Sequence, residues 1–127
     1  MDVLAHGAAV IGAGLEGIAI AEHLVSLGTT TSVAASRPAA QLAPELANTV
    51  PGAAAIDVVD IPSLPDATPV FLAIPLSAMQ SIPPAALAGK LVVDVANFWP
   101  KLDAATALAD APRDSSLVTQ EHFAESA

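Results

Sequence analysis

The stretch Ala8-Ala-Val-Ile-Gly-Ala-Gly-Leu-Glu-Gly17 decides the fold. Its first four residues are apolar, which is typical of a short strand buried in a parallel sheet. The next six match G-x-G-x-x-G in full, and we expect the following residues to form a helix. In this pattern Gly12 permits a tight turn, Gly14 lets main chain approach a pyrophosphate, and Gly17 lets the helix pack closely on the sheet. The stretch therefore predicts a dinucleotide-binding turn at a helix N-terminus.

The helix after the turn is expected to span Leu15 to Leu27. Leu15, Ile18, Ala19 and Val25 recur at helical spacing and predict its apolar face. Gly28 follows, and glycine is the usual residue just past a helix C-terminus because it adopts positive φ without strain.

The rest of the chain alternates short apolar runs with helical patterns, which indicates an α/β fold. We therefore predict a Rossmann-like doubly wound parallel sheet with helices on both faces, in one domain over residues 1–127. About five strands are visible where six are usual, so the domain is expected to be short at its C-terminal end. The further predicted strands are 29–35, 53–59, 70–74 and 91–95. The further predicted helices are 38–48, 76–80, 101–111 and one from Ser115 or Ser116 to Phe123, with a loop or single helical turn over 61–67.

Composition narrows the function. The net charge is −9, with 4 basic against 13 acidic residues, which argues against a nucleic-acid partner. No apolar run reaches the roughly 18 residues of a membrane span. There are no cysteines, which excludes thiolate metal sites and, with no basic leader at the N-terminus, predicts a cytoplasmic protein. The sequence shows no catalytic or metal-binding constellation.

Ser36 and Arg37 point to the kind of nucleotide. NAD-binding domains place an acid about 20 residues past the glycine turn, where it binds the ribose 2′-hydroxyl. Here a hydroxyl and a guanidinium occupy that place. They are suited to a 2′-phosphate, so the sequence favours NADP(H). The alternative is a solvated surface arginine before Pro38.

Glu16 stands inside the glycine motif. Two effects of its carboxylate stay open: a favourable interaction with the dipole of the helix, or repulsion of a bound pyrophosphate.

Several segments together carry a resemblance to a known family. The glycine turn, Ala35-Ser-Arg-Pro38, Ala73-Ile-Pro75, Val93-Asp-Val-Ala-Asn-Phe-Trp-Pro100 and Asp114-Ser-Ser-Leu-Val-Thr-Gln120 resemble the deazaflavin (coenzyme F-420)-dependent NADP reductases. The asparagine–aromatic–Trp–Pro stretch is the most specific of them. The resemblance covers nearly the whole chain. It implies hydride transfer between NADPH and coenzyme F-420, the small-molecule redox substrate.

The resemblance also implies residue roles. Ser36 and Arg37 would hold the 2′-phosphate, Ala73-Ile-Pro75 would border the nicotinamide ribose, and Asn97 would lie near the nicotinamide. Ala73-Ile-Pro75 can equally well be a plain strand end before a helix. Asn97 can equally well be a turn residue that satisfies the local main chain. The residues predicted to contact the cofactor are Gly12, Ala13, Gly14, Leu15, Glu16, Gly17, Ser36, Arg37, Ala73, Ile74, Pro75 and Asn97.

The family's enzymes are longer, with a further strand and C-terminal helices that complete a dimer and the deazaflavin cleft. This chain is therefore expected to be the cofactor-binding half of such an enzyme, either as an isolated fragment or as a naturally short relative. The exposed edge near strand 91–95 predicts a homo-oligomer. Two alternatives stay open: a non-catalytic NADP(H)-binding module, and a reductase of another substrate such as an imine or a β-hydroxyacid.

Overall fold

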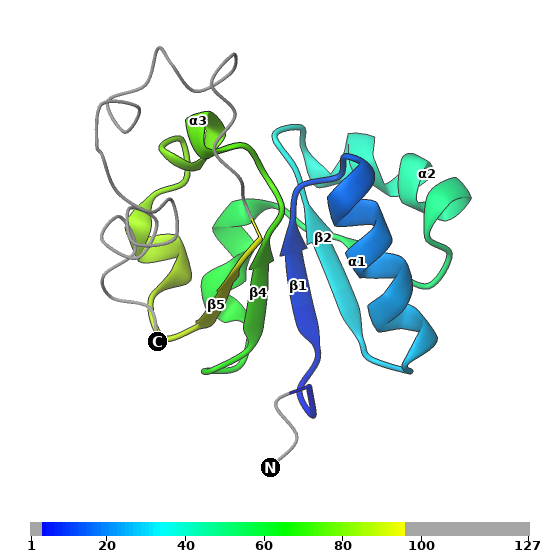
Figure 1. Cartoon of the computed structure of the whole chain (residues 1–127), viewed down its shortest axis with the longest axis horizontal. Helices are drawn as coiled ribbons and strands as arrows, with labels where there is room; N and C mark the ends of the chain where they lie inside the picture. The colour runs from blue at the N-terminus through cyan, green and yellow to red at the C-terminus, as the bar shows by residue number, and fades with distance from the viewer. Residues whose placement is uncertain (1–3, 96–127) are drawn as a thin grey trace.

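The structure is a computed structural model and describes residues 4–95. Its centre is a five-stranded sheet in the order β3-β2-β1-β4-β5, and every neighbouring pair is parallel. The arrows of β1 and β4 point to the same end of the molecule (Figure 1). This order confirms the predicted Rossmann-like sheet. The strands are β1 (Ala8–Ile11), β2 (Thr31–Ala34), β3 (Ala54–Ala55), β4 (Pro69–Leu72) and β5 (Leu91–Asp94).

Helices cover both faces of the sheet, because side chains alternate across a strand. Ala8 and Val10 of β1 pack in one apolar cluster with α1 and α2, while Ala9 and Ile11 pack in a second cluster on the opposite face. Figure 1 shows α1 and α2 together beside β2. The helices are α1 (Leu15–Ser26), α2 (Ala39–Thr49), α3 (Leu76–Met79) and the 3₁₀ helices η1 (Val58–Ser63) and η2 (Pro84–Leu87).

The buried stripe of α1 matches the predicted one in part: Ile18 and Val25 pack against the core, whereas Ala19 is exposed. Gly17, Ala21 and Leu24 face the core at helical spacing, whereas Leu15 is 96% exposed. The glycine turn explains the difference: Gly17 lies against the main chain of the turn, and this contact sets the rotation of the helix. Gly28, as predicted, ends α1. It adopts a φ of +80°.

The third strand is shorter than predicted, because the chain turns at Asp57. There the main-chain N–H of Asp60 donates to the carbonyl of Asp57 over 2.9 Å and begins η1. The Asp57 carboxylate accepts a hydrogen bond of 2.9 Å from the main-chain N–H of Ala39, at the start of α2. Asp57, predicted to lie in the third strand, thus caps a helix that begins 18 residues earlier in the sequence. The helix η1 follows it and begins before the predicted loop.

The other strand and helix boundaries fall within about two residues of the prediction, as is usual for element ends. The short helix η2 was not predicted, since Pro83 and Pro84 read as helix breakers. The predicted helices 101–111 and 115–123 lie outside the described residues. In the described part of the chain, the helices are too short or too polar to cross a membrane.

Candidate cofactor-binding site

The glycine turn joins β1 to α1 through two very close main-chain approaches. Gly12 adopts a φ of +120°, and a Cβ added there would lie 2.3 Å from the carbonyl oxygen of Ala73. A Cβ on Gly17 would lie 2.0 Å from the carbonyl oxygen of Gly12. Real side chains do not tolerate such distances. These two positions therefore require glycine for the fold itself.

Gly14 differs from the other two glycines. It is the N-cap of α1, with a φ of −82°, and a Cβ added there would meet no heavy atom within 4 Å. The space beside it is open. The first N–H groups of a helix have no carbonyl partner within the helix, and the dipole favours an anion there. The start of α1 thus offers donors next to an unfilled space.

The other residues of the motif take different positions. Ala13 is half-buried and packs against the core shared with α1 and α2. Leu15 and Glu16 are exposed in the first turn of α1. Neither of these two side chains lines the larger cleft described next.

A cleft of about 640 Å³ lies at the carboxyl ends of the strands. Ile11 of β1 and Ile74, just after β4, line it, and the order of the sheet reverses between these two neighbouring strands. Ligands of open α/β sheets bind at such a switch point. Of the predicted residues, the cleft contains Ser36, Arg37 and Ile74. The full lining is Ile11, Ala35, Ser36, Arg37, Pro38, Asp57, Val58, Val59, Ile74, Ala78, Ser81, Ile82 and Pro83.

Arg37 is the single basic residue among those lining the cleft. Its Nε donates to both carboxylate oxygens of Glu45, over 3.0 and 3.1 Å, and its Nη2 donates to Oε2. The Arg37 side chain is 35% exposed and the Glu45 side chain 50%. Arg37 is therefore not a fully solvated arginine, because a carboxylate already binds its Nε and Nη2. It is held from the α2 side by a carboxylate.

Sequence analysis missed Glu45, which binds Arg37 from within α2, and Asp57, which accepts a hydrogen bond from the Ala39 N–H at the start of that helix. The sequence did hold a signal for Glu45: it is the only acid within α2, so the predicted helix offered one carboxylate to pair with Arg37. Asp57 left no comparable signal, because its partner Ala39 contributes only a main-chain N–H.

The segment Ala73-Ile-Pro75 lies between β4 and α3. The N–H of Ala73 donates to the Ile11 carbonyl over 2.9 Å, which ties the segment to β1 beside the glycine turn. Pro75 is the N-cap of α3. The strand-end explanation thus accounts for the structure of the segment, while Ile74 also faces the cleft. Asn97 lies outside the described residues.

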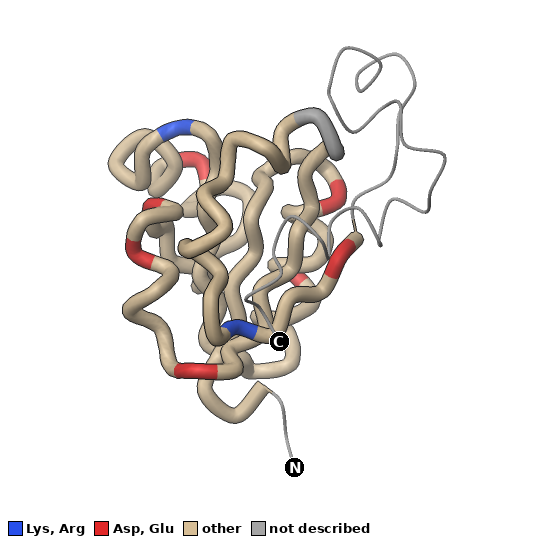
Figure 2. Tube along the Cα trace, turned by 90° about the vertical axis from the view of Figure 1, so that its left-hand side faces the viewer, with Lys and Arg blue, Asp and Glu red and all other residues tan. Residues whose placement is uncertain are grey.

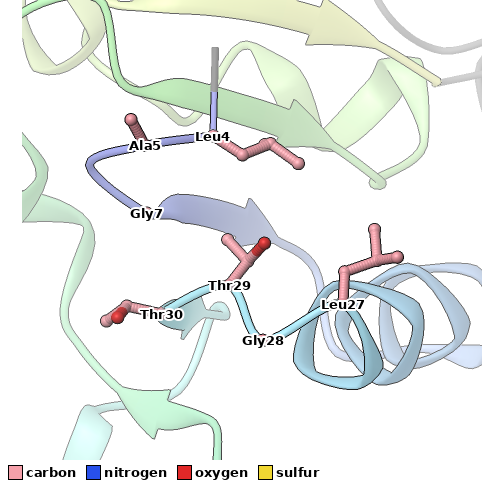
Figure 3. A pocket seen from close by; sticks show the side chains of 7 residues that line it. All are labelled: Leu4, Ala5, Gly7, Leu27, Gly28, Thr29 and Thr30. Atoms are coloured by element: carbon pink, nitrogen blue, oxygen red, sulfur yellow. The ribbon is translucent and has the colours of Figure 1, made fainter. Parts of the chain in front are cut away.

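A smaller hollow of about 390 Å³ lies near the amino ends of β1 and β2. Figure 3 shows it between the segment of Leu4, Ala5 and Gly7 and the turn after α1. Its side chains offer only threonine hydroxyls as polar groups. It lies away from the glycine turn, and nothing in its lining favours a phosphate.

The basic side chains of the described residues set the cleft apart from the rest of the molecule. Figure 2 shows basic segments at two separated places on the trace, one at each end of the strands. Over residues 4–95 these are Arg37 and Lys90, and Lys90 is buried beside the start of β5. Among those same residues, no group of three or more His, Asp or Glu side chains is placed to hold a metal ion. Arg37 is thus the basic side chain available at the carboxyl edge of the sheet.

The strand order, the glycine turn and the cleft at the switch point define a Rossmann-like domain of the kind found in NADP oxidoreductases. The family model described as NADP oxidoreductase, coenzyme F420-dependent, matches residues 8–98. The chain belongs to this family.

The chain resembles the solved structure of a hypothetical protein, SMa0349, from Sinorhizobium meliloti. The TM-score is 0.73 and the sequence identity 26%, with 94% of this chain and 58% of the other covered. The chain therefore matches little more than half the length of that protein. No curated protein matches the chain.

The glycine contacts predict different costs for two matched substitutions. Gly17→Ala forces a Cβ against the Gly12 carbonyl, so we expect it to lower the free energy of unfolding by about 1–3 kcal/mol, the usual cost of overpacking. Gly14→Ala adds its methyl group to open space, and we expect a change within about 0.5 kcal/mol. Urea unfolding followed by circular dichroism measures both. Equal stabilities for the two variants would contradict the close packing of α1 on the turn.

Proposed function

We propose that the chain binds NADP(H) across the carboxyl edge of its sheet and supplies the cofactor-binding part of a reductase. The observation that carries the proposal is the position of Arg37, which is the one basic side chain that lines the cleft at the topological switch point. The diphosphate would lie over Gly14, at the start of α1, where the space is open. The 2′-phosphate would lie at Ser36 and Arg37.

The adenosine half of the nucleotide has a suitable surface in this cleft. Val59 lies at its rim and is 79% exposed, although it is a large apolar side chain. Pro38 lines the same cleft. An adenine ring that covers Val59 would remove that apolar surface from water, which favours binding. The cleft thus offers an apolar surface to the adenine base and the guanidinium of Arg37 to the 2′-phosphate.

The proposed reaction is hydride transfer between NADPH and a deazaflavin of the coenzyme F420 type. Membership of the family supports this choice of acceptor. The nicotinamide supplies the hydride when bound, and the protein's task is to hold the two rings in place. Ala73-Ile-Pro75 would border the nicotinamide ribose, since Ile74 faces the cleft next to the glycine turn. Asn97 is proposed to lie near the nicotinamide by the family resemblance.

Comparison of two nucleotides tests the role of Arg37. NADPH and NADH differ only in the 2′-phosphate, so each titration serves as the control for the other. In isothermal titration calorimetry we expect NADPH to bind more tightly. Arg37→Ala should weaken NADPH by about 1.5–3 kcal/mol, the scale of a charge-assisted hydrogen bond, and leave NADH nearly unchanged. Equal binding of both nucleotides to the unchanged chain would refute the assignment to NADP(H).

Gly14→Ala tests the diphosphate position. The new methyl group would fill the space where a phosphate must come within hydrogen-bond distance of main-chain N–H groups. We therefore expect it to weaken NADPH and NADH alike, by roughly tenfold or more, because the charged hydrogen bonds to the diphosphate lengthen. Calorimetry measures this as well. Unchanged affinity for both nucleotides, in a variant that folds normally, would place the diphosphate elsewhere.

We further propose that the protein forms homo-oligomers through the region around β5. In the described part of the chain β5 lies at the edge of the sheet, and an uncovered edge strand presents main-chain donors and acceptors to another chain. Sedimentation velocity at increasing protein concentration should show a dimer or larger species. A monomer at every concentration would rule this assembly out.

A further inference from the structure

The ion pair at the proposed phosphate site uses one edge of the Arg37 guanidinium. Nε donates to both carboxylate oxygens of Glu45, and Nη2 donates to one of them. A guanidinium binds a carboxylate or a phosphate through the same pairs of parallel N–H groups. Glu45 therefore satisfies Arg37 with the chemistry that a 2′-phosphate would use.

The two residues stand differently toward the cleft. Arg37 lines it, whereas Glu45 lies on α2 and is not among the lining residues. A phosphate would thus approach Arg37 from the cleft while the carboxylate holds it from the helix. The anion can bind in two ways: it displaces the carboxylate, or it sits near it and is repelled. Both cost part of the binding free energy of the phosphate.

We propose that Glu45 is a specificity-determining residue, which competes with the 2′-phosphate for Arg37 and lowers the affinity for NADP(H) without affecting NAD(H). This inference rests on the proposed function. Both side chains are partly exposed, so water and salt screen the pair and it is weak. A phosphate, with nearly two charges, can therefore take the guanidinium from a single carboxylate.

An opposite role for Glu45 gives the opposite result. If the carboxylate served mainly to hold Arg37 in a binding conformation, its loss would free a long side chain and weaken NADPH. The direction of the change on removing the carboxylate therefore separates competition from positioning.

The variant Glu45→Gln removes the charge and keeps the shape of the side chain. At low ionic strength we expect NADPH to bind about fivefold more tightly, since one exposed ion pair and one like charge near the phosphate are removed. NADH should change less than about twofold, because it carries no 2′-phosphate. Glu22→Gln is the matched control: it removes the same charge from an exposed site on α1 and should alter neither affinity.

A double-mutant cycle shows whether Glu45 acts through Arg37. In the Arg37→Ala background the gain from Glu45→Gln should be largely lost, because no guanidinium remains to be released. A gain of the same size in both backgrounds would overturn the competition. Unchanged or weaker NADPH binding by Glu45→Gln alone would overturn it too.

These outcomes are separate from a failure of the proposed function. If the unchanged chain binds NADPH more tightly than NADH and Glu45→Gln has no effect, only the role of Glu45 is refuted. If the unchanged chain binds neither nucleotide, the cofactor site is refuted and the role of Glu45 with it.

Discussion

The packing of α1 on the sheet depends on the close approach of Gly17 to the carbonyl of Gly12, where a Cβ on Gly17 would lie only 2.0 Å from the oxygen. It fixes how α1 sits on the sheet, and it exposes Leu15 while it buries Ala21 and Leu24. The same turn touches Ala73, so β4 is tied to β1 at the point where the strand order reverses. The cleft lies at this same carboxyl edge and is lined by Ile11 and Ile74 from the two tied segments.

The second set of constraints gathers at the start of α2. Asp57 caps the helix at Ala39, and Glu45 binds Arg37 from within the helix. One acid thus binds Arg37, and the other lines the same cleft. In a chain of net charge −9, Arg37 is thus paired with a carboxylate, and both side chains of the pair remain partly exposed.

Much of the fold was accessible from the sequence, because it rests on local patterns. The apolar run of β1, the glycine turn and the glycine after α1 each reflect local main-chain geometry, which neighbouring residues determine. Periodicity predicted the buried stripe of α1 only in part, since Ile18 and Val25 pack against the core and Leu15 does not. Alanine and leucine recur on more than one face of that helix, and only the packing of Gly17 selects the buried one.

By itself the sequence determined the order of elements, the three glycines and the presence of Ser36 and Arg37 after β2. Each of these depends on residues close together in the chain. Tertiary structure alone decided that Gly14 borders open space while Gly12 and Gly17 are enclosed. It also decided that the chain after β3 turns at Asp57, which caps α2, and that Arg37 is bound to Glu45. The reason is distance: contacts between segments depend on how helices rotate and pack, which no local pattern records.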